Sequence, residues 1–277
     1  MLLSVLSGRP SKASSSHLLI RNSTDTALNS TDAFLKSKLK FVRDGHGQDI
    51  CLLRTGHEEV GVMMGWETPI MQETVKLLCD DHPHSGQLKI LNVGFGLGIV
   101  RVNCFALWSV LRRLQIDTLF QAHQPVQHFI IEPHPDVLQH MKNLGWYNKP
   151  GVTILEGKWQ DCVTADRLLA MGGFDVIYID TFSENYGDLK AFLEHLPDLL
   201  AGPDARFSFF NGLGANNFLF YDVFTRLSEL HLSDVGVDVE WHDIFVGDNT
   251  SERWGRTLQY FTMPLYRLPI GKMGISK

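Results

Sequence analysis

The sequence predicts an α/β protein in which a mostly parallel sheet is covered by helices on both faces. From residue 88 onwards, short apolar segments alternate with amphipathic ones, as expected for strands joined by helices. Near the C-terminus, two strand-like segments, VDVEWHDIFV and RTLQYFTMPLYRL, are separated only by a loop and predict a closing antiparallel hairpin. The first apolar segment of the series runs into three glycines, KILNVGFGLGIV, which indicates that something approaches this backbone closely.

The individual elements follow from periodicity and from helix-start signals. We expect a short helix over 32–42, a loop with a short strand over 43–59, and a helix over 68–81 that begins at Thr68 and Pro69. Parallel strands are then predicted at 88–93, 127–133, 152–157, 174–180 and 206–211. The helices between and after them are predicted at 99–115, 135–144, 160–171, 187–200 and 216–232. The hairpin strands are predicted at 237–246 and 256–268.

Composition limits the classes of function. The chain has 277 residues, 44% of them hydrophobic, and a net charge of −6, which argues against a general nucleic-acid binder. The four cysteines lie apart without a CxxC pair and no histidines have ligand spacing, so we expect no metal site and a reducing compartment, cytoplasmic or nuclear. No apolar run approaches the length of a membrane span.

The N-terminal segment differs in composition from the remainder of the chain. Its first 24 residues are rich in serine and contain no acid, which resembles a mitochondrial transit peptide. A flexible tail is the simpler interpretation. We therefore expect a tail over 1–31 and one domain over 32–277.

The glycine spacing distinguishes between two ligands. A dinucleotide-binding loop has its third glycine three positions after the second, whereas Gly94, Gly96 and Gly98 alternate and position 99 is isoleucine. This spacing favours S-adenosylmethionine (SAM), with S-adenosylhomocysteine (SAH) as product. Glu132 ends the next strand, where an acid can bind ribose hydroxyls. The alternatives are a tight strand–helix turn for the glycines and a solvated strand end for Glu132.

Several motifs together resemble one family. GVMMGWETPIMQ, LNVGFGLGI, FIIEPHPDVLQHM, GWYNKPGVTILEGKWQD, FDVIYIDTFSENY and FSFFNGLGANN occur in order and closely resemble the protein arginine N-methyltransferase 2 family. The chain is similar, more distantly, to guanidinoacetate N-methyltransferase. The resemblance implies a class I SAM-dependent methyltransferase (Rossmann-like) fold. It also implies methylation of the δ-nitrogen of an arginine in a ribosomal protein.

The resemblance also implies residue roles. Glu67 and Asp180 would be catalytic and face the guanidino group, with Trp66 and Asn211 as further substrate-binding residues. The SAM-binding residues would be Met63, Met71, Gly94, Phe95, Gly96, Gly98, Glu132, Pro133, His134, Gly157, Lys158, Trp159 and Asp180.

Two carboxylates suit a guanidino substrate for a physical reason. A guanidinium has no free lone pair, but two carboxylates can bind it, orient one nitrogen and accept a proton as the N–C bond forms. Each residue also has a simpler interpretation. Glu67 could merely interact favourably with the dipole of the helix that follows it, and Asp180 could merely be the last residue of a strand. Trp66 could pack in the core, and Asn211 could cap a helix. His134 could be a surface residue that starts a helix.

Two departures from the family pattern keep alternatives open. No ankyrin-type repeat precedes the similarity, which makes a small guanidino compound such as guanidinoacetate or free arginine an alternative substrate. Gly98 and Glu132 lie unusually far apart, and residues 101–115 have the character of an insertion beside the glycine loop. An inactive SAM-fold scaffold is therefore a further alternative.

Overall fold

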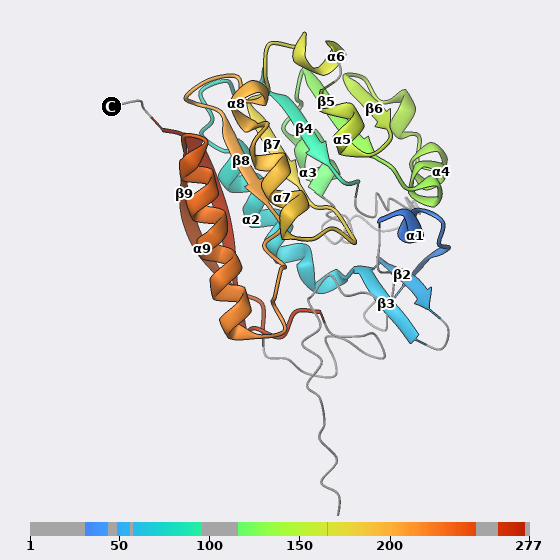
Figure 1. The fold of residues 1–277 in the computed structure, drawn as a ribbon. Coiled ribbons are helices and arrows are strands. Elements are labelled where there is room, and N and C mark those ends of the chain that lie inside the picture. The colour runs from blue at the N-terminus through green and yellow to red at the C-terminus, as the bar shows by residue number, and fades with distance from the viewer. Residues whose placement is uncertain are drawn as a thin grey trace, which may run out of the picture.

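A seven-stranded sheet forms the centre of the molecule (Figure 1). The structure is a computed structural model that describes residues 31–43, 49–55, 58–95, 116–164, 166–247 and 260–274. In spatial order the strands are β6 (Val152–Glu156), β5 (Gln127–Glu132), β4 (Lys89–Val93), β7 (Val176–Ile179), β8 (Arg206–Phe209), β10 (Leu265–Met273) and β9 (Val237–Phe245).

The pairing of these strands confirms the predicted architecture. The five strands from β6 to β8 are parallel, while β10 is antiparallel to both β8 and β9. Five parallel strands with a terminal antiparallel hairpin make up the class I SAM-dependent methyltransferase fold. In such a sheet the carboxyl ends of the parallel strands meet at one edge, where ligands bind.

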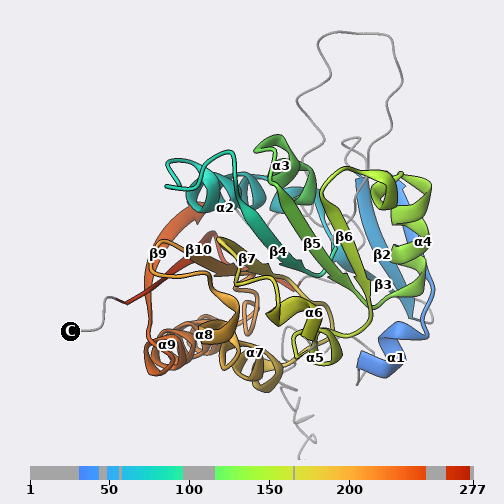
Figure 2. The ribbon, with the colours of Figure 1, turned by 90° about the horizontal axis from the view of Figure 1, so that it is seen from above.

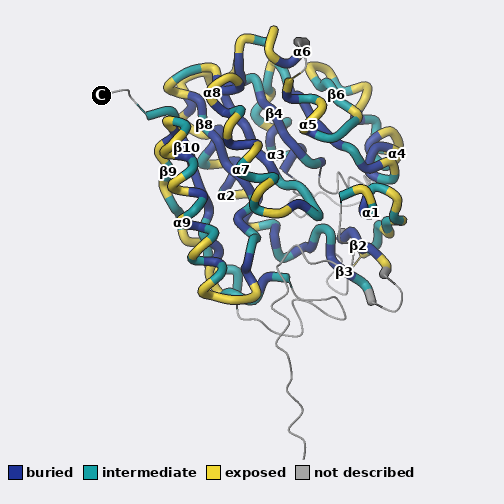
Figure 3. The backbone as a smooth tube through the Cα atoms, viewed as in Figure 1, coloured by how far each residue is buried: buried dark blue, intermediate teal, exposed yellow. Residues whose placement is uncertain are grey.

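Helices cover both faces of the sheet (Figure 2). The helices on one face are α2 (Thr68–Cys79), α3 (Ile116–Ala122) and α4 (Pro135–Asn143), and those on the other are α5 (Trp159–Cys162), α6 (Asp166–Leu169), α7 (Tyr186–Leu193), α8 (Leu196–Leu199) and α9 (Phe218–Asp234). Strands β4, β5, β7 and β8 in the middle of the sheet are buried along most of their length (Figure 3). Burial on both faces explains why these strands are continuous apolar runs in the sequence.

A second sheet corrects the prediction for the N-terminal part. The predicted helix over 32–42 is wrong beyond its first turn, because α1 (Thr31–Leu35) is followed by strand β1 (Leu39–Arg43). The segment predicted as a loop with one short strand contains β2 (Asp49–Thr55) and the start of β3 (Glu58–Met63), and the three strands form an antiparallel sheet.

Two predicted helices are each divided into two. Residues 160–171 contain α5 and α6, and residues 187–200 contain α7 and α8. The second division falls just before Pro197, which has no N–H to donate to the carbonyl of Leu193 at the end of α7.

Some expectations lie outside the described residues: the N-terminal tail, the helix over 99–115 and the proposed insertion over 101–115. Within the described part of the chain, no helix is both long and apolar enough to cross a membrane.

Candidate active site

A cavity of about 190 Å³ lies between the carboxyl ends of the parallel strands and the three-stranded sheet. Its walls include the last residues of β4, β5 and β7, as well as residues of β1, β2 and β3. Nine of the predicted site residues line it: Met63, Glu67, Gly94, Phe95, Glu132, Pro133, Lys158, Trp159 and Asp180.

Gly94 joins the ends of three neighbouring strands. Its N–H donates to the Ile131 carbonyl over 2.9 Å, and its own carbonyl accepts from the Asn92 side chain over 3.0 Å. Its φ is +93°, and a Cβ placed on it would lie 2.0 Å from the carbonyl oxygen of Asp180. Only glycine fits here, because the chain needs both the positive φ and the close contact.

Glu132 is a buried carboxylate at the end of β5. Its Oε2 accepts from the Phe95 N–H over 2.9 Å and its Oε1 from the His134 N–H over 2.7 Å. Burial raises the pKa of Glu132 to about 7, although the two backbone hydrogen bonds lower it. Each oxygen has two lone pairs, so the carboxylate can still accept hydroxyl groups from the cavity.

The wall beyond β6 combines an aromatic ring with charged groups. Lys158 pairs with Asp32 of α1, with 2.5 Å between Nζ and Oδ1, which holds α1 against this end of the cavity. Trp159 begins α5 and packs edge-on against Phe192, with ring centroids 5.3 Å apart. Its indole Nε1 donates to Glu184 over 2.7 Å. A flat ring fixed in this way could border an adenine.

Glu67 enters the cavity from the short 3₁₀ helix η1 (Gly65–Glu67), just ahead of α2. Its Oε2 accepts from the Met64 N–H over 3.0 Å, and its Oε1 accepts from the Tyr260 hydroxyl. Its side chain makes no capping hydrogen bond to the first turn of α2. The carboxylate is therefore directed by Met64 and Tyr260 and not by the helix that follows.

Asp180 lies directly after β7 and also lines the cavity. Burial raises the pKa of Asp180 to about 7, and a hydrogen bond from the Tyr178 side chain lowers it. The charges of Asp180 and Glu67 both raise the pKa of the same two buried phenols, Tyr178 and Tyr266. Glu67 and Asp180 also line the same cavity.

Three predicted site residues lie behind the cavity wall instead of lining it. Met71 is buried on α2, with its sulfur 3.8 Å from the Tyr178 hydroxyl. Trp66 packs on Tyr260 and Phe261, with ring centroids 5.8 and 5.4 Å away. Gly157 donates its N–H to the Glu132 carbonyl over 3.1 Å.

His134 and Asn211 are both buried and hold neighbouring segments together. His134 starts α4 as expected, but it is not at the surface: its Nδ1 accepts from the Asp136 N–H, and its Nε2 lies 3.1 Å from the Phe34 carbonyl. The Asn211 amide donates to Tyr221, Thr225 and the carbonyl of Arg267. Gly96 and Gly98 lie outside the described residues.

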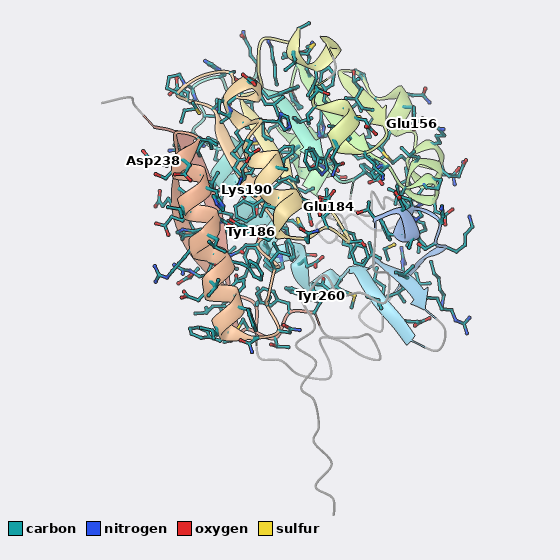
Figure 4. All side chains as sticks on the ribbon, viewed as in Figure 1. Glu156, Glu184, Tyr186, Lys190, Asp238 and Tyr260 are labelled. Atoms are coloured by element: carbon teal, nitrogen blue, oxygen red, sulfur yellow. The ribbon has the colours of Figure 1, made fainter. Side chains whose placement is uncertain are left out.

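Sequence reasoning missed several residues of the cavity. Tyr260 lies ahead of β10 and lines the cavity beside β3, and Glu184 lies just before α7 (Figure 4). Thr31 and Phe34 of α1 and Phe182 also line the wall. The motif FDVIYIDTFSENY contains Phe182 and Glu184, so their closeness to Asp180 was a usable signal. Tyr260 had no such signal.

Comparison with known proteins identifies the family. The chain is 42% identical to protein arginine N-methyltransferase 2 of Cryptococcus neoformans var. neoformans over 92% of its own length and 71% of that protein's length. It belongs to the protein arginine N-methyltransferase 2 family. The family member from Saccharomyces cerevisiae is 39% identical over 78% of this chain. A comparison with models of protein families gives no match.

The chain covers these relatives to different extents. It spans 71% of the Cryptococcus protein but only 47% of the Saccharomyces protein. Similar solved structures include a spermidine synthase from Thermotoga maritima (TM-score 0.47, 16% identity, 86% of this chain and 73% of that one) and an O-methyltransferase from Bacillus cereus in complex with SAH (TM-score 0.44, 13% identity, 75% of this chain and 80% of that one).

Proposed function

We propose that the chain is a SAM-dependent methyltransferase that modifies the guanidino group of an arginine residue in a protein. The observation that carries this proposal is that Glu67 and Asp180, from distant parts of the sequence, line one cavity with Gly94 and Glu132. We further propose that the δ-nitrogen is the acceptor and that the target is a ribosomal protein. These two details follow from the resemblance of the motifs to the family.

The residues present fit SAM as a cofactor. Bound SAM would supply a methyl group attached to a positively charged sulfur. Glu132 would accept the ribose hydroxyls with its remaining lone pairs, Trp159 would border the adenine, and the close-packed backbone at Gly94 would leave room for the amino-acid end.

Glu67 and Asp180 would hold the guanidinium from two sides. A cation beside Asp180 lowers the pKa of its carboxyl, so binding favours the ionised form that can orient the acceptor nitrogen. As that nitrogen gains the methyl group, it loses a proton, which one of the two carboxylates can accept. Most of the acceleration would come from alignment of the acceptor, which the fixed hydrogen bonds of Glu67 support.

Replacing Asp180 by asparagine tests the assignment. Asp180→Asn keeps the shape but removes the charge, so we expect methyl transfer to fall by about a hundredfold or more while SAH affinity changes less than about threefold. Asp222→Asn, at a partly exposed position on α9, is the matched control. Unchanged turnover in Asp180→Asn would remove its role.

The substrate is tested by incubation with labelled SAM. The wild-type protein is offered a ribosomal protein extract, guanidinoacetate and free arginine in parallel, followed by mass analysis. Label on the δ-nitrogen of a protein arginine is the expected result. Label only in a small guanidino compound would refute the protein substrate, and no SAH binding by calorimetry would refute the cofactor.

A further inference from the structure

One buried carboxylate of the cavity wall has no role in the proposed chemistry. Glu184 is 8% exposed and accepts three hydrogen bonds, from Trp159 Nε1 over 2.7 Å, from Gln160 Nε2 over 3.2 Å and from Thr181 Oγ1 over 2.5 Å. All three donors are neutral. A buried carboxylate that is satisfied only by neutral donors is energetically demanding, so its position calls for an explanation.

The three donors come from the two ends of the proposed site. Trp159 and Gln160 start α5, in the wall that would border the adenine, whereas Thr181 directly follows Asp180, which would face the guanidinium. We infer that Glu184 is a positioning residue that fixes the Trp159 ring and the Asp180 loop relative to each other. This inference rests on the proposed function, because it assumes that SAM binds between them.

The backbone between Asp180 and Glu184 supports the same inference. Ser183 has a φ of +66°, in a region that residues with a side chain rarely adopt. Such a conformation persists only where the surroundings impose it. The hydrogen bond from Thr181 to Glu184 closes this turn, and the contact from Trp159 anchors it to the start of α5. The strained turn and the indole therefore depend on one carboxylate.

The hydrogen-bonding chemistry of residue 184 decides which replacement can keep these contacts. The indole N–H of Trp159 and the amide of Gln160 share Oε1, while the Thr181 hydroxyl uses Oε2. Alanine would leave the buried indole N–H without an acceptor. Glutamine can still accept from the indole through its amide oxygen, and its NH₂ group can donate to the Thr181 hydroxyl, because a hydroxyl both donates and accepts.

The test compares Glu184→Ala with Glu184→Gln and with Glu194→Ala, an exposed glutamate at the end of α7 that pairs with Lys190. SAH affinity is measured by calorimetry at a temperature where all variants are folded. We expect Glu184→Ala to weaken SAH binding by about tenfold or more, as for loss of one charge-assisted hydrogen bond, and Glu184→Gln by less than about threefold. Glu194→Ala should bind as the wild type does. Equal SAH affinity in Glu184→Ala and wild type would overturn the inference.

A second readout does not need SAM. The chain has six tryptophans, so the contribution of Trp159 to the fluorescence is obtained by comparing each protein with its Trp159→Phe variant. Glu184→Ala should shift the Trp159 emission to longer wavelength as the indole becomes mobile and hydrated, and no shift would count against the inference. If the wild type binds no SAH, the proposed function fails, while the emission shift still decides whether Glu184 fixes Trp159.

Misfolding of Glu184→Ala would not end the test. Trp159→Phe and Thr181→Val remove two of the three donors one at a time, and each should weaken SAH binding when made alone. The double variant Trp159→Phe/Thr181→Val should lose less SAH affinity than the sum of the two single losses, because both donors act through the one carboxylate. Fully additive losses would overturn the inference.

Discussion

Replacing Gly94 by alanine should lower the stability of the fold and weaken ligand binding at the site. The same replacement at Gly86 provides the reference. Gly94 has a φ of +93°, and its Cβ would lie 2.0 Å from the Asp180 carbonyl oxygen. Gly86 has a similar φ of +81°, but a Cβ there would meet nothing within 4 Å. The two variants share the backbone penalty and differ in the steric contact.

The expected magnitudes follow from this difference. A positive φ costs about 1–2 kcal/mol for alanine, and relief of overpacking by movement of the surrounding backbone costs roughly 1–3 kcal/mol more. We expect Gly94→Ala to lower the free energy of unfolding by about 2–5 kcal/mol, and Gly86→Ala by about 1–2 kcal/mol. Because the clash is with Asp180 itself, Gly94→Ala should also reduce methyl transfer.

Urea denaturation measures the free energy of unfolding, and calorimetry measures SAH affinity in the folded variants. The expected result is a larger loss of stability in Gly94→Ala than in Gly86→Ala, together with weakened SAH binding only in Gly94→Ala. Equal losses of stability in the two variants, with unchanged SAH binding, would refute the reasoning.

Two further predictions concern the acids of the site. Tyr260→Phe removes the hydroxyl that donates to Glu67, so we expect kcat/KM for the arginine substrate to fall by about tenfold while SAH affinity stays unchanged. Steady-state kinetics measures kcat/KM and calorimetry measures SAH affinity. A loss confined to SAH binding would contradict this prediction. Burial raises the pKa of Asp180 from its model-compound value of 3.8 to about 7, so the folded state keeps a proton that the unfolded chain has released between these pH values. The contribution of Asp180 to the free energy of unfolding should therefore decrease as the pH rises through this range, while kcat/KM increases as Asp180 ionises. In urea denaturation at several pH values, the free energy of unfolding of Asp180→Asn should decrease less with rising pH than that of the wild type. An identical pH dependence in the two proteins would contradict the assignment.

The parallel sheet could be predicted because its signals are local. Each strand is a short apolar run bounded by polar or glycine residues, and burial on both faces requires such runs. The three-stranded sheet could not be predicted in the same way. Leu39 and Phe41 alternate along β1 and pack against the group around α4, but their spacing from Phe34 and Leu35 also fits a helix. The segment forms a strand because it pairs with β2, and this pairing cannot be recognised from the local sequence of β1.

The candidate site was predictable where it depends on strand ends. Gly94, Glu132 and Asp180 follow neighbouring parallel strands, so topology alone brings them to one edge. Tyr260 was not predictable, because it lies far along the chain from Glu67 and their contact is not local. Asn211 and Met71 belong to the motifs that carry the family resemblance, as several lining residues do. Their side chains are buried in the core, and this depends on packing contacts that cannot be inferred from the sequence.

The position of Tyr260 affects when the cavity can form during synthesis. Thr31 and Tyr260, near opposite ends of the described chain, line the same cavity. A nascent chain therefore exposes Glu67 long before its hydroxyl partner has left the exit tunnel of the translating machinery. Closing such long-range contacts is slow. Ligand recognition should thus arise only after translation has passed the last hairpin, and polypeptides that terminate early should lack it.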